Sequence, residues 1–279
     1  MMTQKDWEKQ YQRFVIARNE GNREEIDKII ELVQPQFENP SLDDSGWLET
    51  SLQDPNIKMF VTLVASRAPV LSEKLFDPLM RAGVEEINPD FNRAFIEPCV
   101  KHFGPRRVNE YLLNILETGP PFEQAGAINA MYWAQIPLVF LMKGIKMSLV
   151  NIDDAEADSE FSLEQATEES RTKYMELMDI WDRKRLLFLE HFVKSKNVEV
   201  QQSIIPSLDL NVENYPESHK SLVTEAIQIA RSHPDEYIRH RLGVQLGTEK
   251  TLRALPYRKK SQENQKLSLR DRLLAFLKK

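Results

Sequence analysis

The side chains that could perform nucleophilic chemistry in this chain are few. Cys99 and His102 lie three positions apart, a spacing that places both on one face of a helix. A catalytic cysteine–histidine pair also needs a third group that orients the histidine, and a cleft open to substrate. Cys99 instead follows Pro98 in an apolar run, where a small buried side chain is expected. The chain has no Gly-x-Ser-x-Gly motif and no glycine-rich phosphate loop, so we predict no catalytic residue.

The histidines do not show the spacing of a metal site. None of the five has a second histidine four residues away, which would place two imidazoles on one side of a helix. Glu190 and His191 follow Leu186, Leu187 and Leu189, a pattern typical of a partly buried helix. We therefore predict no metal ion and no other cofactor.

The charge distribution argues against nucleic acid as the main ligand. The net charge is −6, and residues 253–279 carry +7, which leaves −13 for the first 252 residues. Such an acidic body repels phosphates and accelerates the encounter with a basic protein. The single cysteine excludes an intramolecular disulfide, and the first residues lack the apolar run of a signal peptide. We expect a cytoplasmic protein without a transmembrane segment.

An uncharged stretch from Ala125 to Met142 is expected at the centre of the core. Asn129, Gln135 and Pro137 lie inside it and argue against a membrane span. A helix that is apolar on all sides belongs in the middle of a protein. The stretch predicts two buried helices separated by a turn at Gln135, the second of which runs from Pro137 to Leu149.

Helix-start signals recur along the chain. Proline in the first turn, with a short polar residue beside it, is typical of a helix N-terminus. These signals occur at Asp54-Pro55, Asn88-Pro89, Pro120-Pro121, Asn197 and Pro234-Asp235. Partner helices are expected at residues 71–82, 106–117, 137–149 and 219–231, and one long helix at about 162–192. Starts that are 34, 32 and 37 residues apart indicate an array of helix pairs that bury their faces by stacking.

The last of these starts carries a family resemblance. The segment from Pro234 to Arg239, followed by Leu242, Leu246 and Gly247, resembles the signature of HEAT repeats. Asp54 to Lys58 resembles it with lysine in place of arginine, and the starts at Asn88 and Asn197 resemble it more loosely. The resemblance covers roughly Ser51 to Gly247 and implies an all-α, HEAT-like (armadillo/HEAT-type) solenoid of about five to seven stacked helix pairs.

This interpretation divides the chain into three parts. Residues 1–50 are expected to form an N-terminal helical cap, and residues 51–252 the repeat array, with an acidic insert at 151–170. Residues 253–279 form a basic tail that ends in a short amphipathic helix. That helix could bind a partner groove or an anionic membrane, but we favour a role as a cap on the last repeat, because stacked arrays must cover their apolar ends.

The resemblance also suggests where a partner would bind. In HEAT-like proteins the helix after each Asp-Pro turn usually lines the concave side, and the arginine of the signature, here Arg239, usually makes a structural contact between repeats. His240 and Arg241 could instead contact an acidic partner. The candidate partner-binding residues are Asn92, Asn129, Trp133, Arg239, His240 and Arg241.

The expected function is a non-enzymatic protein-binding scaffold or adaptor. A basic partner, as for an immunity- or inhibitor-type protein, is the sharper hypothesis, because the body of the chain is acidic. The enzyme alternative is a HEAT-like DNA glycosylase, in which Trp133 and Trp181 would contact a base. A third alternative is a tetrapyrrole lyase or chaperone, to which some HEAT-like repeats belong. A positive concave surface would favour the glycosylase, and a negative one the basic partner.

Overall fold

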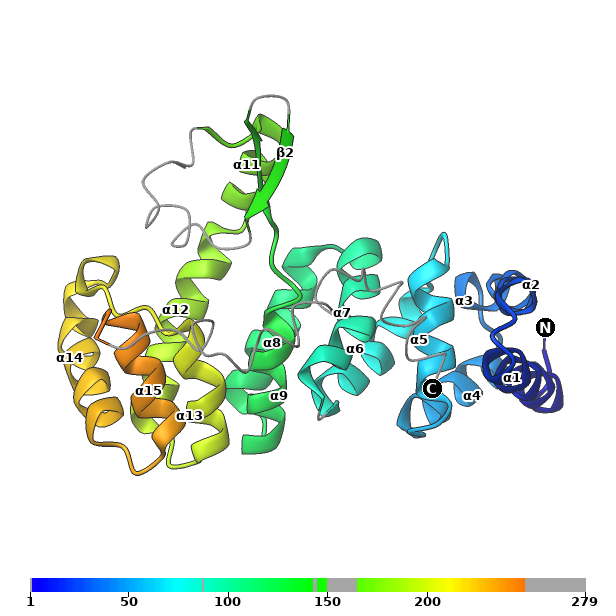
Figure 1. The fold of residues 1–279 in the computed structure, drawn as a ribbon, viewed down its shortest axis with the longest axis horizontal. Helices are drawn as coiled ribbons and strands as arrows, with labels where there is room; N and C mark the ends of the chain where they lie inside the picture. Colours follow the sequence, from blue (N-terminus) through cyan, green and yellow to red (C-terminus); the bar gives the residue numbers. More distant parts are fainter. Residues whose placement is uncertain (1, 87, 143–144, 150–164, 249–279) are drawn as a thin grey trace. The chain divides into compact units, whose positions relative to one another are not determined.

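The computed structural model describes residues 2–86, 88–142, 145–149 and 165–248 (Figure 1). This part of the chain is all-α apart from one two-stranded hairpin. It divides into two compact units, residues 2–83 with 243–248, and the described residues from 84 to 242. The predicted tail at 253–279 and most of the predicted acidic insert lie outside the described residues. No helix within the described ranges is both long enough and apolar enough to cross a membrane.

The first unit is a cluster of short helices. They are α1 (Gln4–Asn19), α2 (Arg23–Val33), α3 (Pro35–Glu38), α4 (Leu42–Gln53), α5 (Lys58–Arg67) and η1 (Glu73–Leu75), followed by α6 (Phe76–Glu85), which ends in the second unit. The predicted helix start at Pro55 is wrong by three residues. Asp54 accepts a hydrogen bond from the backbone of Asn56 at 2.7 Å, which closes a turn before α5 begins at Lys58.

A buried carboxylate organises the core of the first unit. Asp44 is fully buried and accepts hydrogen bonds from the Trp7 indole at 2.8 Å and the Ser41 hydroxyl at 2.6 Å. Burial would raise the pKa of Asp44, but these hydrogen bonds outweigh it and hold the pKa below its usual range. Trp47 stacks on Trp7 with ring centroids 4.5 Å apart and is 8% exposed.

The second unit contains the longer helices and the hairpin. Its elements are α7 (Pro89–Phe103), α8 (Pro105–Thr118), α9 (Pro121–Met131), β1 (Leu138–Met142), β2 (Ile145–Leu149), α11 (Glu168–Met175), α12 (Met178–Lys194), α13 (Val198–Ile204), η3 (Ile205–Ser207), η4 (Val212–Asn214), α14 (Glu217–Ser232) and α15 (Glu236–Gln245), of which the last three residues belong to the first unit. The predicted starts at Asn88 and Asn197 are confirmed, because both side chains cap their helices by accepting a backbone N–H.

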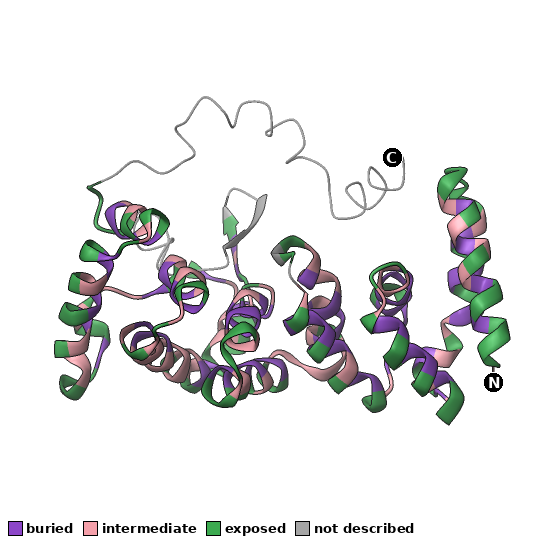
Figure 2. Ribbon diagram, turned by 90° about the horizontal axis from the view of Figure 1, so that it is seen from below, coloured by how far each residue is buried: buried purple, intermediate pink, exposed green. Residues whose placement is uncertain are grey.

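Helices of the second unit pack in pairs. Helix α9 contacts α7, α8 and α13, and helix α12 contacts α8, α13 and α14. The pair α8–α9 therefore lies against the pair α12–α13, with α8 on α12 and α9 on α13 (Figure 1). Buried and exposed residues occupy different sides of the individual helices (Figure 2). Two ion pairs connect α8 to α12, Arg106 with Asp179 at 2.7 Å and Glu117 with Arg183 at 2.5 Å.

The predicted second helix of the uncharged stretch is wrong. Residues 138–142 and 145–149 form the antiparallel strand pair β1–β2, with Phe140 opposite Met147. The other edge of β1 is also occupied, because Thr167 donates its N–H to the Val139 carbonyl at 2.7 Å and Ser170 accepts from the Val139 N–H at 3.0 Å. A short apolar run fits a buried strand as well as a buried helix, so these tertiary contacts decided the outcome.

The predicted long helix at 162–192 is interrupted. Helix α11 ends at Met175 and α12 begins at Met178, and Leu177 between them has a non-helical backbone with φ −110° and ψ 12°. Leu177 is only 2% exposed. Burial of this apolar side chain accompanies the break between the two helices.

Helix α9 approaches its neighbour too closely for a side chain at one position. A Cβ atom at Gly126 would lie 1.9 Å from the carbonyl oxygen of Val84. Gly126→Ala should therefore lower the free energy of unfolding, by about 2 kcal/mol or more, because backbone would have to move. Urea unfolding followed by circular dichroism measures this change.

The matched control is Gly46→Ala in α4. A Cβ atom there meets nothing within 4 Å, and the helical backbone needs no positive φ. This change should raise the free energy of unfolding by roughly 0.5–1 kcal/mol, because alanine restricts the unfolded chain. Equal stability of the Gly126→Ala variant and the parent protein would contradict the close packing of α9.

Candidate partner-binding pocket

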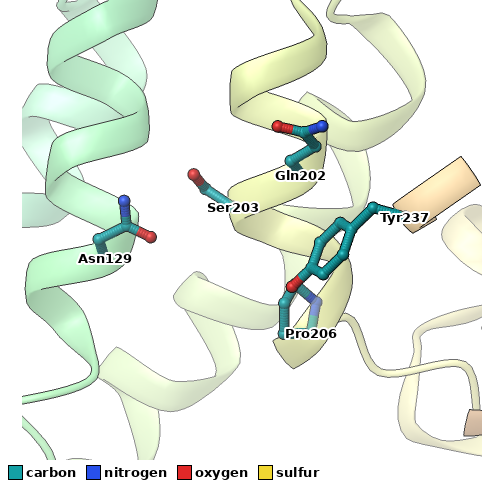
Figure 3. Close-up of a pocket in the computed structure, with 5 residues that line it drawn as sticks. All are labelled: Asn129, Gln202, Ser203, Pro206 and Tyr237. Carbon is teal, nitrogen blue, oxygen red and sulfur yellow. The ribbon is translucent and has the colours of Figure 1, made fainter. Parts of the chain in front are cut away.

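Side chains from four helices of the second unit line an open pocket of about 470 Å³ (Figure 3). Asn129 comes from α9, Gln202 and Ser203 come from α13, Pro206 from η3 and Tyr237 from α15. The packing of α9 against α13 brings the first three together, although more than 70 residues separate Asn129 from Gln202 in the sequence. Figure 3 shows the Asn129 amide and the Ser203 hydroxyl on opposite sides of the space between these two helices.

Helical periodicity aims these side chains at the pocket. Asn129 lies between Ile128 and Ala130, which are 5% and 0% exposed and anchor the opposite side of α9 in the core. On α13 the pocket residues follow Gln201, which is 5% exposed. The buried neighbours fix the rotation of each helix about its axis, so the half-buried positions between them face the pocket.

Most polar groups in the pocket have no hydrogen-bond partner among the residues that the structure describes. The Asn129 amide, the Ser203 hydroxyl and the Tyr237 hydroxyl make no side-chain hydrogen bond to any residue in the described part of the chain. Gln202 differs, because its Nε2 donates to Asp235 Oδ2 at 2.9 Å. Among the described residues, no side chain that lines the pocket is charged. The pocket therefore offers neutral donors and acceptors to a polar ligand.

A buried hydrogen-bond relay supports the wall that α13 and α15 form. The Gln201 amide donates to the Phe192 carbonyl at 3.0 Å, and its oxygen lies 3.1 Å from Nε2 of His233. His233 accepts at Nδ1 from the backbone N–H of Asp235 at 3.0 Å, so its proton is on Nε2 and points at Gln201. Asp235 then caps α15 through Ile238 at 3.1 Å.

The three predicted partner-binding residues on α15, Arg239, His240 and Arg241, have different surroundings. Arg239 donates to the backbone carbonyls of His233 and Pro234, the latter at 2.7 Å, and so fastens the turn before its own helix. His240 is half-buried. The Nε of Arg241 is buried and has no hydrogen-bond partner in the described ranges. All three lie on α15 with Tyr237, but none of them lines the pocket.

The predicted partner-binding residue Trp133 lies just after α9 and contacts the Arg93 guanidinium. It follows the end of α9, and the Arg93 guanidinium lies 4.9 Å from its ring centroid. Arg93 pairs with Glu97 at 2.5 Å, and the Tyr132 ring meets Trp133 edge-on at 4.7 Å. Asn92, the predicted residue beside Arg93, is fully buried, and its amide has no hydrogen-bond partner among the described residues.

The possible nucleophile and the possible metal ligands lie elsewhere. Cys99 is fully buried, and burial raises the pKa of its thiol well above the usual range, which the charge of Arg107 only partly opposes. Burial also lowers the pKa of His191, although the Glu190 carboxylate opposes this. In the described ranges no three histidine, cysteine or carboxylate side chains gather closely enough to hold a metal ion.

Four of the five pocket residues were not among the sequence candidates. Gln202, Ser203 and Pro206 stand beside buried positions of a short helix, and nothing in their local sequence marks them. The sequence does contain a signal for Tyr237. It is a large aromatic residue in the first turn of a predicted helix, between the polar Glu236 and the buried Ile238. Asn129 was a candidate and lies in the pocket; its role in binding stays a prediction.

Comparison with models of known protein families, with curated proteins and with solved structures found no match.

The thiol of Cys99 should be inert in the folded protein. A thiol that is fully buried with a raised pKa supplies almost no thiolate at neutral pH. We expect 5,5′-dithiobis(2-nitrobenzoic acid) to release no chromophore from the native protein over an hour, and one equivalent after denaturation in urea. Rapid stoichiometric reaction without denaturant would contradict this and would reopen the cysteine–histidine hypothesis.

Proposed function

We propose that this protein is a non-enzymatic protein-binding module whose second unit receives a partner at the pocket around Asn129 and Tyr237. The observation that carries the proposal is a set of neutral groups from α9, α13 and α15 that meet in one open space, most of them without a hydrogen-bond partner among the described residues. Burying such groups without partners costs about 1–3 kcal/mol each, so an occupant must supply matching hydrogen bonds. A segment of another protein has suitable groups along its whole length.

The packing of the helices supports a HEAT-like solenoid as the scaffold of this surface. The pair α8–α9 lies on the pair α12–α13, and α14 continues along α12. Of the five helices that follow the predicted starts, α9, α13 and α15 contribute to the pocket, and α5 and α7 do not. This agrees with the expectation, drawn from the family resemblance, that such helices carry the ligand-facing side.

The charge of the chain favours a basic partner around the neutral pocket. The first 252 residues carry −13, so a basic protein would be attracted over a long range before it docks. In this proposal the negative electrostatic potential of the chain accelerates association with the partner, and the pocket determines which partner binds. An immunity- or inhibitor-type protein that binds a basic enzyme would use both the acidic charge and the neutral pocket.

The DNA glycosylase alternative has one observation in its favour. Trp133, Arg93 and Glu97 combine an aromatic ring, a basic group and a carboxylate in one cluster. The guanidinium is already paired with Glu97 at 2.5 Å, and little of its charge is left for a phosphate. We therefore rank protein recognition above base excision.

The proposal is tested by capturing partners from the source cells with the tagged full chain. We expect the parent protein to retain one protein in near-stoichiometric amount at low salt, and to lose most of it at about 0.5 M salt because charge attraction is screened. The double variant Asn129→Ala/Tyr237→Ala should retain at least tenfold less. Quantitative mass spectrometry measures both effects.

The matched control is Tyr132→Ala. Tyr132 is 54% exposed and does not line the pocket, whereas Tyr237 is 41% exposed and does. The control should capture as much partner as the parent protein. Equal capture by the pocket variant and the parent, or recovery of nucleic acid instead of protein, would overturn the proposal.

A further inference from the structure

Resting on the proposed function, we propose that the pocket binds an uncharged, proline-rich segment of the partner in the polyproline II conformation. The pocket combines one apolar side and one polar side, and each matches a different property of such a segment. Tyr237 and Pro206 form the apolar side. The polar side is the space between α9 and α13, which the Asn129 amide and the Ser203 hydroxyl border from opposite directions.

The apolar side is made of two rings. The Tyr237 ring is exposed by 41% and extends from the start of α15 towards the pyrrolidine ring of Pro206 on η3 (Figure 3). Exposed tyrosine rings bind apolar groups at a small loss of side-chain entropy, because only two torsion angles become fixed. Prolines of a polyproline II helix are already rigid, and grooves lined by aromatic residues bind them for this reason.

The polar side supplies hydrogen-bond donors. A polyproline II segment makes no internal hydrogen bonds, so its carbonyl oxygens are free, and proline itself has no N–H to offer. The Asn129 amide provides two N–H donors, and the hydroxyls of Ser203 and Tyr237 provide one each. None of these donors is used within the described part of the chain. The pocket can therefore pair with several carbonyls of the ligand.

The electrostatics of the pocket disfavour a charged ligand segment. The nearest carboxylate in the supporting relay is that of Asp235, whose oxygens already accept from Gln202 at 2.9 Å and from the backbone of Ile238 at 3.1 Å. A lysine or a glutamate placed in the pocket would lose hydration without gaining a counter-charge. The basic residues of a partner would therefore flank the segment and would not enter the pocket.

The test uses fluorescein-labelled decaproline and the full chain, with binding followed by fluorescence anisotropy. We expect saturable binding, and at least tenfold weaker binding of a Gly-Ser peptide of equal length, because that peptide is flexible and has no rings. Tyr237→Ala should weaken decaproline binding at least tenfold, and Asn129→Ala about fivefold. Tyr132→Ala should bind as the parent protein does.

A second variant keeps the test valid if Tyr237→Ala reduces stability. Tyr237→Phe keeps the ring and removes only the hydroxyl, so we expect two- to fivefold weaker binding with an unchanged melting temperature. Equal binding of decaproline and the Gly-Ser peptide, or equal binding by the parent, Tyr237→Ala and Asn129→Ala proteins, would overturn the inference.

The two proposals can fail separately. If a partner is captured through the pocket but decaproline does not bind, protein recognition stands and the polyproline ligand is wrong. If decaproline binds through Tyr237 while the pocket variants still capture the cellular partner, the ligand inference stands and the proposed function is wrong.

Discussion

The arrangement of the pocket depends on the two hydrogen bonds of the buried Gln201 amide. Gln201 connects the end of α12, through the Phe192 carbonyl at 3.0 Å, with the turn before α15, through His233 at 3.1 Å. His233 in turn accepts the backbone N–H of Asp235, and Asp235 holds the pocket residue Gln202 at 2.9 Å. Because unpaired polar groups are costly in a buried site, this relay allows few alternative positions for α13 relative to α15.

Steric close approach sets the other wall of the pocket. Gly126 lets α9 approach the Val84 carbonyl to a distance that a Cβ atom would not permit, and Ala125, Ala127 and Ala130 are small and buried on the same helix. Small residues of this kind allow close approach of backbones. Hydrogen bonds thus hold the wall formed by α13 and α15, and close packing holds the wall formed by α9. Asn129 projects from α9 towards α13.

Local signals in the sequence predicted most helices and several of their starts. The caps at Asn88, Asn197 and Asp235 depend on hydrogen bonds within a few residues, so they are visible in the sequence. The strand pair at 138–142 and 145–149 was missed, because β1 depends on residues 166–170 for part of its pairing. The pocket was found only in part, because its members come from elements separated by up to about a hundred residues, and their juxtaposition is a property of helix packing.

The most direct test of this account is the free energy of unfolding of Gln201→Leu, measured in urea beside Gln228→Leu on the exposed side of α14. Leucine at 201 would leave the Phe192 carbonyl and the His233 N–H buried without their partner. The account predicts a loss of about 2 kcal/mol or more for Gln201→Leu and a change within about 0.5 kcal/mol for the control. Equal stability of the two variants would show that the relay does not hold the pocket together.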